Sequence, residues 1–258
     1  MANPARTLLG SVLWFPWSLV AWLSTLGTMM VIAFISLPIV LFVPFEKFQH
    51  KVFHDKCAWP LYLMFSPLRV IRDENYDPSR VSVYTQNHVS MLDANIAIGS
   101  IRVPLCGLEN ASHLNIPGYG WLLRISNAIP VRKGASRFRR IAEAFRERTS
   151  RGISVLAFPE GHRTLDAHLG KLKTGVFRAA RDAGMPIVPV MSRGASKLLP
   201  KGAFTIRPSP IEVYIAPQIE TKGLTDEQIP LLMERVREVM EAWIERKEML
   251  GHRCLEPL

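Results

Sequence analysis

The hydrophobic pattern of the chain changes character near residue 45. From Thr7 to Phe45 no charged residue occurs, and the stretch is rich in Leu, Val, Trp and Phe. One membrane span needs roughly 20 apolar residues, so this stretch is too long for a single upright helix and nearly long enough for two. It is also too long for the core of a signal peptide, and it lacks a small-residue cleavage pattern. The pattern predicts an N-terminal hydrophobic helical segment, residues 1–65, that anchors the protein to a membrane.

Two arrangements of this anchor remain open. Pro16, Gly27 and Pro38 are candidate break points. The segment forms either one tilted spanning helix with an interfacial lead-in or a hairpin that dips into one leaflet. We favour the hairpin, because Arg6 and Lys47 then lie on the same, cytoplasmic side. A buried core hairpin of a soluble protein is the structural alternative.

After residue 65 the pattern alternates between short β-branched runs and stretches of helical period. Strands are expected at 68–72, 81–86, 103–106, 128–131, 153–158 and 185–190, with a closing hairpin of 204–206 and 211–215. Helices are expected after Asp93 and at 119–125, 135–150, 172–183 and 225–249. Strands that alternate with helices predict an α/β domain, residues 66–258.

The first candidate chemical site follows the strand at 81–86. His88 comes at the carboxyl end of that strand, and Asp93 comes five residues later, where a helix is expected to begin. Ligands of α/β sheets bind outside the carboxyl ends of the strands. A carboxylate can hold one imidazole nitrogen and leave the other free to take a proton. Ser90 or Asn87 could instead cap the following helix, so a structural interpretation of this turn stays open.

A second polar turn follows the strand at 153–158. It contains Glu160, Gly161, His162 and Arg163. The glycine lets the backbone approach a ligand closely, and the arginine offers a planar fork for phosphate oxygens. Two strands that both end in polar side chains are expected to bring those ends to the same rim of the sheet.

Together, Asn-His-Val-Ser-Met-Leu-Asp at 87–93 and Phe-Pro-Glu-Gly-His-Arg-Thr at 158–164 resemble the glycerolipid acyltransferase family (1-acylglycerol-3-phosphate acyltransferase-like). That family carries N-H-x-x-x-x-D and F-P-E-G-T-R-S motifs in this order. The resemblance extends over roughly residues 65–220. It implies a glycerol-phosphate acyltransferase-like fold, with a mixed sheet flanked by helices. His162 replaces the usual Thr, and it either fills the turn or tunes substrate choice near neutral pH.

The resemblance implies transfer of a fatty acyl group from an acyl-CoA or acyl-carrier-protein thioester to the free hydroxyl of a lysophospholipid. The expected acceptor is 1-acylglycerol-3-phosphate, and the product is phosphatidate. His88 would act as general base, and Asp93 would hold its tautomer. Gly161 would permit close approach of the phosphate that Arg163 grips. Glu160 is expected to orient Arg163 or to bind the glycerol hydroxyl.

A further family motif ends in an apolar strand and an arginine. Here Ala128–Val131 leads to Arg132, which the resemblance assigns as a second phosphate contact. Glu109 and Asn110 stand where the family usually has basic residues, so this part of the headgroup site departs from the family pattern.

The formal charge of +10 and the sequence pI near 9.9 indicate an anionic partner. The hydrophobic segment argues for membrane lipids and against nucleic acid, and the arginines around 135–150 add attraction to anionic lipids. Three scattered cysteines fit a reducing compartment, and no metal or other cofactor is expected. We therefore expect an enzyme of the inner or cytoplasmic membrane, with its catalytic domain on the cytoplasmic face.

Three other functions remain as alternatives: an acyltransferase for another lyso-lipid, a lipid-ester hydrolase and a non-catalytic lipid-binding protein. Neither a Gly-x-Ser-x-Gly elbow nor a His-Glu-x-x-His motif occurs, which argues against the two commonest hydrolase types.

Overall fold

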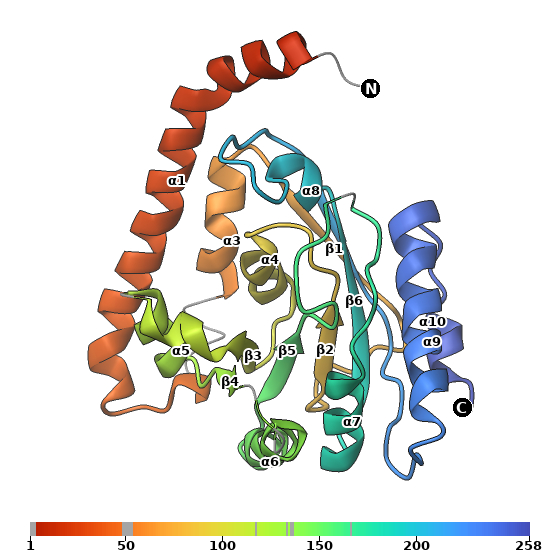
Figure 1. The fold of residues 1–258 in the computed structure, drawn as a ribbon. Helices are drawn as coiled ribbons and strands as arrows, with labels where there is room; N and C mark the ends of the chain where they lie inside the picture. Colours follow the sequence, from red (N-terminus) through yellow and green to blue (C-terminus); the bar gives the residue numbers. More distant parts are fainter. Residues whose placement is uncertain (1–3, 48–53, 117, 133, 135–136, 166) are drawn as a thin grey trace.

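A seven-stranded sheet forms the centre of the protein (Figure 1). The computed structural model describes residues 4–47, 54–116, 118–132, 134, 137–165 and 167–258. The strand order across the sheet is β1-β7-β6-β2-β5-β3-β4. In chain order the strands are β1 (Leu68–Arg72), β2 (Val83–Gln86), β3 (Leu105–Asn110), β4 (Ile129–Val131), β5 (Ser154–Ala157), β6 (Ile187–Arg193) and β7 (Ile211–Ile215).

The sheet is mixed, as the resemblance implies. Neighbouring strands run parallel except for β6 and β7, which are antiparallel. The predicted closing hairpin is wrong: residues 204–206 form no strand, and β7 pairs with β6 on one side and β1 on the other. β2 lies between β5 and β6. The parallel neighbours β2, β5 and β3 therefore end at one rim of the sheet.

Helices cover both faces of the sheet (Figure 1). They are α1 (Pro4–Val40), α3 (His54–Leu63), α4 (Asp93–Ser100), α5 (Tyr119–Ile125), α6 (Arg137–Ser150), α7 (Thr174–Ala183), α8 (Ala195–Leu198), α9 (Ile229–Glu241) and α10 (Gly251–Leu255). A 3-10 turn at Ala111–Asn115 precedes α5, and a π turn at Ala242–Arg246 ends α9 earlier than its apolar period predicts. Gly184 closes α7 in the left-handed conformation, with φ of 66°.

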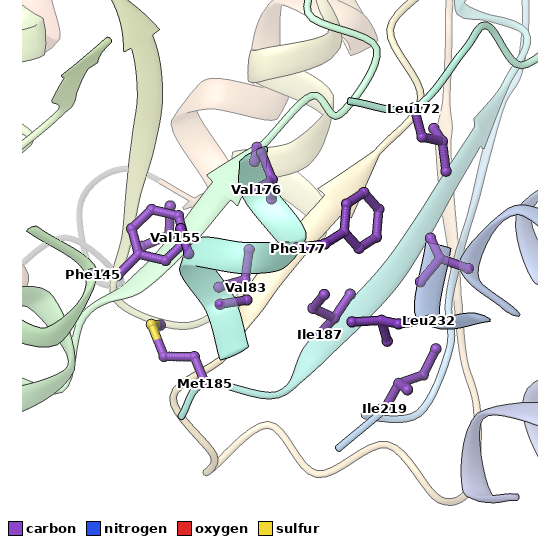
Figure 2. Packing of buried hydrophobic residues seen from close by; sticks show 14 of the residues in the cluster. Val83, Phe145, Val155, Leu172, Val176, Phe177, Met185, Ile187, Ile219 and Leu232 are labelled. Atoms are coloured by element: carbon purple, nitrogen blue, oxygen red, sulfur yellow. The ribbon is translucent and has the colours of Figure 1, made fainter. Parts of the chain in front are cut away.

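Alternating side chains of the central strands divide the core into two layers. Val83 of β2 points into the layer beneath α6, α7 and α9, whereas the next residue, Tyr84, points into the layer beneath α3, α4 and α8. In the first layer Phe177 of α7 extends toward Ile187 of β6, with Leu232 of α9 next to it (Figure 2). Burial on both faces explains why these strands read as nearly continuous apolar runs.

The N-terminal stretch forms one continuous helix, α1, so the hairpin expected within residues 7–45 is wrong. Pro16 and Pro38 both lie inside this helix without ending it. Its segment Trp14–Val40 is long and apolar enough to cross a membrane. Its buried face toward the domain consists of small or polar residues with one isoleucine: Ser18, Ala21, Thr25, Ile32 and Ser36.

α1 is held against the α/β domain by specific contacts with the loop after α8. The indole of Trp22 donates to the carbonyl of Phe204 at 2.9 Å, and the two rings stack with centroids 5.9 Å apart. The hydroxyl of Ser18 accepts from the amide of Ile206 at 2.8 Å. These bonds satisfy backbone groups of residues 204–206, which pair with no strand of the sheet.

Candidate active site

The end of β2 is fixed by the side chain of Asn87. Its amide nitrogen donates to the carbonyl of Ser192 on β6 at 3.0 Å, and its oxygen accepts from the amide of Ser192 at 2.8 Å. This pair of bonds continues the sheet by one residue through a side chain. Asn87 is therefore part of the scaffold and not a cap of the following helix, and His88 follows it directly.

His88 and Asp93 are brought together by a tight turn at the start of α4. His88 Nδ1 lies 2.8 Å from Asp93 Oδ2. The same oxygen accepts from the amides of Val89 at 2.6 Å and Ser90 at 2.8 Å, so the turn closes around this carboxylate. No side chain caps α4, so the capping interpretation of Ser90 is also wrong.

The buried carboxylate of Asp93 fixes the orientation of the histidine ring through its hydrogen bond to Nδ1. Asp93 is completely buried, and this burial raises its pKa, while hydrogen bonds from His88 and the two amides oppose that rise. When Asp93 is ionised it can only accept, so a neutral His88 ring then donates from Nδ1 to Oδ2 and keeps the lone pair of Nε2 free. The side chain of His88 is 23% exposed, so this lone pair belongs to a group that a substrate can reach.

Phe158 supports the other side of the imidazole. The two rings stack with centroids 4.2 Å apart and an angle of 20° between their planes. The sequence analysis assigned no role to this phenylalanine, although it opens the Phe-Pro-Glu-Gly motif. The feature of the sequence that could have indicated this contact is the position of Phe158 at the end of β5, the strand that neighbours β2.

Glu160 does not have the role that the sequence analysis expected. It is completely buried, and its two oxygens accept from the backbone amides of His88 at 2.7 Å and Gly170 at 2.8 Å. Burial raises the pKa of Glu160, and these two amide donors oppose the rise. Neither oxygen contacts Arg163, so Glu160 is a positioning residue and lies too deep to bind a glycerol hydroxyl.

The register of β2 and β5 explains why Glu160 meets His88. Val83 pairs with Val155, an offset of 72 residues, and the same offset separates His88 from Glu160. The loops beyond both strands thus stay in register. A second bond, from the amide of Thr164 to the carbonyl of His88 at 2.9 Å, ties the far end of the polar turn to the histidine.

Beyond the buried Glu160, the turn leaves His162 and Arg163 accessible from outside. Gly161 has φ of 70°, a left-handed conformation that favours glycine. His162 is exposed, and its Nδ1 lies 3.0 Å from the carbonyl of Glu160 in the same turn. The guanidinium of Arg163 is partly exposed and has no hydrogen-bond or ion-pair partner within the described part of the chain.

Arg132 lies further along the rim than the other candidates. It is exposed and directly follows β4, which is separated from β5 by β3. The structure records no contact between its side chain and the other candidate residues, so its phosphate role stays a prediction. Beside it at the end of β3, Glu109 Oε2 pairs with His113 Nδ1 at 2.8 Å. Among the described residues, no three His, Cys, Asp or Glu side chains gather as a metal site.

Comparisons with known proteins agree with this architecture. Residues 67–193 match the family model described as Acyltransferase, a range that contains every candidate site residue. The crystal structure of the 1-acyl-sn-glycerophosphate (LPA) acyltransferase from Thermotoga maritima superposes with a TM-score of 0.76 at 24% identity. This match covers 90% of the present chain and 96% of the other.

These findings define the class of protein: residues 67–193 form an acyltransferase domain, and the relatives that the chain resembles are named 1-acyl-sn-glycerol-3-phosphate acyltransferases. The chain is 28% identical over 211 residues to a 1-acyl-sn-glycerol-3-phosphate acyltransferase of Chlamydomonas reinhardtii, covering 80% of this chain and 61% of that protein. It is 26% identical to the enzyme of the same name from Pseudomonas aeruginosa, covering 78% of each. The chain spans about three fifths of the length of the first curated relatives that it matches.

Replacing Glu160 with Gln is expected to lower the thermal stability of the protein. A glutamine side chain has one acceptor oxygen, so one of the two amides, of His88 or Gly170, loses its bond in a buried place. An unsatisfied buried donor costs about 1–3 kcal/mol. Circular dichroism melting of Glu160→Gln measures this loss against Glu234→Gln, whose side chain is exposed on α9. Equal melting temperatures for the two variants would contradict the positioning role.

Proposed function

We propose that the protein transfers a fatty acyl group from an acyl-CoA or acyl-carrier-protein thioester to the free hydroxyl of 1-acylglycerol-3-phosphate, which makes phosphatidate. The observation that carries this proposal is the 2.8 Å contact between His88 Nδ1 and Asp93 Oδ2, beside a turn with an unpaired arginine. A base and a cation at one rim suit an acceptor that has both a hydroxyl and a phosphate.

The reaction moves the hydroxyl proton of the acceptor to the leaving thiolate, and it replaces the carbon–sulfur bond of the thioester with a carbon–oxygen bond. His88 Nε2 takes the hydroxyl proton as the acceptor oxygen attacks the thioester carbonyl, and Asp93 stabilises the resulting imidazolium. The tetrahedral intermediate collapses, the carbon–sulfur bond breaks, and the imidazolium returns the proton to the leaving thiolate. The donor is already an activated ester, so no acyl-enzyme is required.

The phosphate of the acceptor is held by Arg163, whose guanidinium makes no bond within the described protein and is free to grip oxygen atoms. Arg132 approaches from the far end of the rim. The buried, amide-bonded Glu160 does not oppose the anion at close range. The exposed His162 has one of the two roles expected from the sequence: it either fills the turn or adds charge that tunes substrate choice.

Incubation of membranes with labelled acyl-CoA and 1-acylglycerol-3-phosphate separates this reaction from its alternatives. Transfer yields labelled phosphatidate, a lipid-ester hydrolase yields labelled free fatty acid, and a lipid-binding protein yields neither. A panel of other lyso-lipids as acceptors decides whether the phosphate monoester is the preferred headgroup.

Loss of the base is expected to remove most of the activity. His88→Ala and Asp93→Asn should each reduce kcat by about 10²- to 10⁴-fold, because a positioned general base contributes a factor of that size. Steady-state assays measure the change, and a melting curve tests that each variant remains folded. Near-normal turnover by a folded His88→Ala protein would contradict the role of His88 as the general base.

Arg163→Ala is expected to act mainly on acceptor binding. A hydrogen bond to a charged group is worth about 1.5–3 kcal/mol, so KM for 1-acylglycerol-3-phosphate should rise by about one to two orders of magnitude. KM for a 1-monoacylglycerol, which has no phosphate, should change little. An equal change for both acceptors would contradict the assignment of Arg163.

We also propose that α1 anchors the protein to the inner or cytoplasmic membrane. Its outward face carries large apolar side chains that are strongly exposed, including Leu23, Leu26, Met30 and Phe34. Such a surface is stable against lipid and costly in water. The arginines of α6 add attraction to anionic lipids: Arg139 and Arg140 are exposed, and Arg146 keeps its charge although it donates to the carbonyl of Asp182.

Flotation with vesicles of neutral phospholipid tests this anchor. Replacement of four outward residues by Ser (Leu19, Leu23, Leu26 and Met30) should abolish flotation in about 0.5 M salt, where charge attraction is screened. A control variant loses exposed apolar side chains of the catalytic domain instead, with Leu231, Met249 and Leu255 changed to Ser. If both variants float like the wild type, α1 is not the anchor.

A further inference from the structure

Lys173 lies directly against the polar turn and was not singled out by the sequence. It immediately precedes α7, and its backbone amide donates to the carbonyl of Pro159 at 2.8 Å. Its ammonium group lies where a Cβ at Gly161 would stand. The φ of 70° favours glycine at position 161, and a side chain there would also push the end of Lys173 aside.

Lys201 contacts the same turn from a different loop. It belongs to the loop after α8, and its ammonium group donates to the carbonyl of Arg163 at 2.7 Å. The loop is held in place by its contacts with α1, in which Phe204 accepts from Trp22. The position of Lys201 is thus fixed at two points: its loop is bonded to α1, and its ammonium group is bonded to the Arg163 carbonyl.

The two lysines and Arg163 concentrate positive charge on one short turn. Within the described residues, none of the three cations forms an ion pair with a carboxylate. The nearest carboxylate of the turn, Glu160, faces inward and accepts from backbone amides. Like charges gathered on one turn repel one another, and an anion bound at the turn would relieve that repulsion.

We propose that Lys173 and Lys201 are ligands of the phosphate monoester on the acceptor, acting together with Arg163. The proposal rests on the proposed acyl transfer. A phosphate monoester carries about −1.5 to −2 charge at pH 7, which one guanidinium does not balance. The lysines supply the additional charge: Lys173 over Gly161 and Lys201 beside Arg163. Phosphate groups of a CoA donor share this chemistry, so the experiment separates the two sources.

Steady-state kinetics of Lys173→Met and Lys201→Met test the proposal. Methionine retains an unbranched apolar chain and removes the charge. KM for 1-acylglycerol-3-phosphate should rise about tenfold in each variant, as expected for one lost charged hydrogen bond, with KM for 1-monoacylglycerol unchanged. The control variants are Lys171→Met and Lys197→Met, which remove exposed lysines outside the turn. A rise confined to KM for acyl-CoA would instead assign the lysines to the donor phosphates and overturn the acceptor assignment.

A second measurement does not depend on turnover. Acetylation of lysines in the full-length wild-type protein, followed by mass spectrometry, reports which ammonium groups a ligand covers. 1-Acylglycerol-3-phosphate should slow labelling of Lys173 and Lys201 several-fold relative to Lys171, whereas 1-monoacylglycerol should not. Protection in a protein that transfers no acyl group would refute the proposed reaction and leave the anion site standing. Active protein with no protection and unchanged KM values would refute the anion site alone.

Discussion

The two hydrogen bonds of Glu160 hold the site together from inside the protein. One oxygen accepts from the amide of His88 and the other from the amide of Gly170, so one carboxylate joins the loop after β2, the loop after β5 and the segment that leads to α7. A buried carboxylate loses much of its hydration, which is unfavourable by several kcal/mol unless donors replace the water. Amide donors do so here with charge-assisted bonds, which are stronger than bonds between neutral groups.

This arrangement separates charge across the polar turn. The carboxylates of Asp93 and Glu160 are both completely buried and face backbone amides, while Arg163 and Lys173 lie on the outer side of the same loops. The negative charges thus organise the backbone, and the positive charges remain available to a ligand. An acceptor phosphate meets cations first, although the loops beneath it depend on anions. The acidic glutamate of the Phe-Pro-Glu-Gly motif is therefore compatible with phosphate binding.

Much of the fold follows from local patterns in the sequence. A period-two run predicts β2 and apolar runs predict β5 and β6, and the five-residue spacing of His88 and Asp93 already indicates a shared turn. The role of Glu160 was beyond such reasoning, because its partner lies 72 residues away and meets it only through the register of β2 and β5. Lys173 was missed for a similar reason, since its contact with Gly161 depends on the path of the intervening loop.

Two predictions were wrong, the hairpin at the N-terminus and the strand near residue 205, and neither outcome can be read from local propensity. The hairpin was favoured because it would place Arg6 and Lys47 on one side, with Pro16 and Pro38 as candidate break points, but α1 continues through both prolines. The strand expected at 204–206 was lost because the loop bonds to Ser18 and Trp22 of α1 instead of a neighbouring strand. Local propensity could not indicate a partner about 180 residues away in the chain.

The strand order also constrains how the protein is made. β1 is an edge strand whose partner in the sheet is β7. Leu68 therefore cannot form its pair until Ile211 is synthesised, 143 residues later. α1 precedes every strand of the sheet in the sequence, and its segment Trp14–Val40 is long and apolar enough to enter a bilayer before the sheet is complete. With α1 anchored as proposed above, the unpaired strands would be tethered at a membrane surface during synthesis, where two chains meet less freely than in solution. Such anchoring would limit aggregation until the late strand completes the sheet.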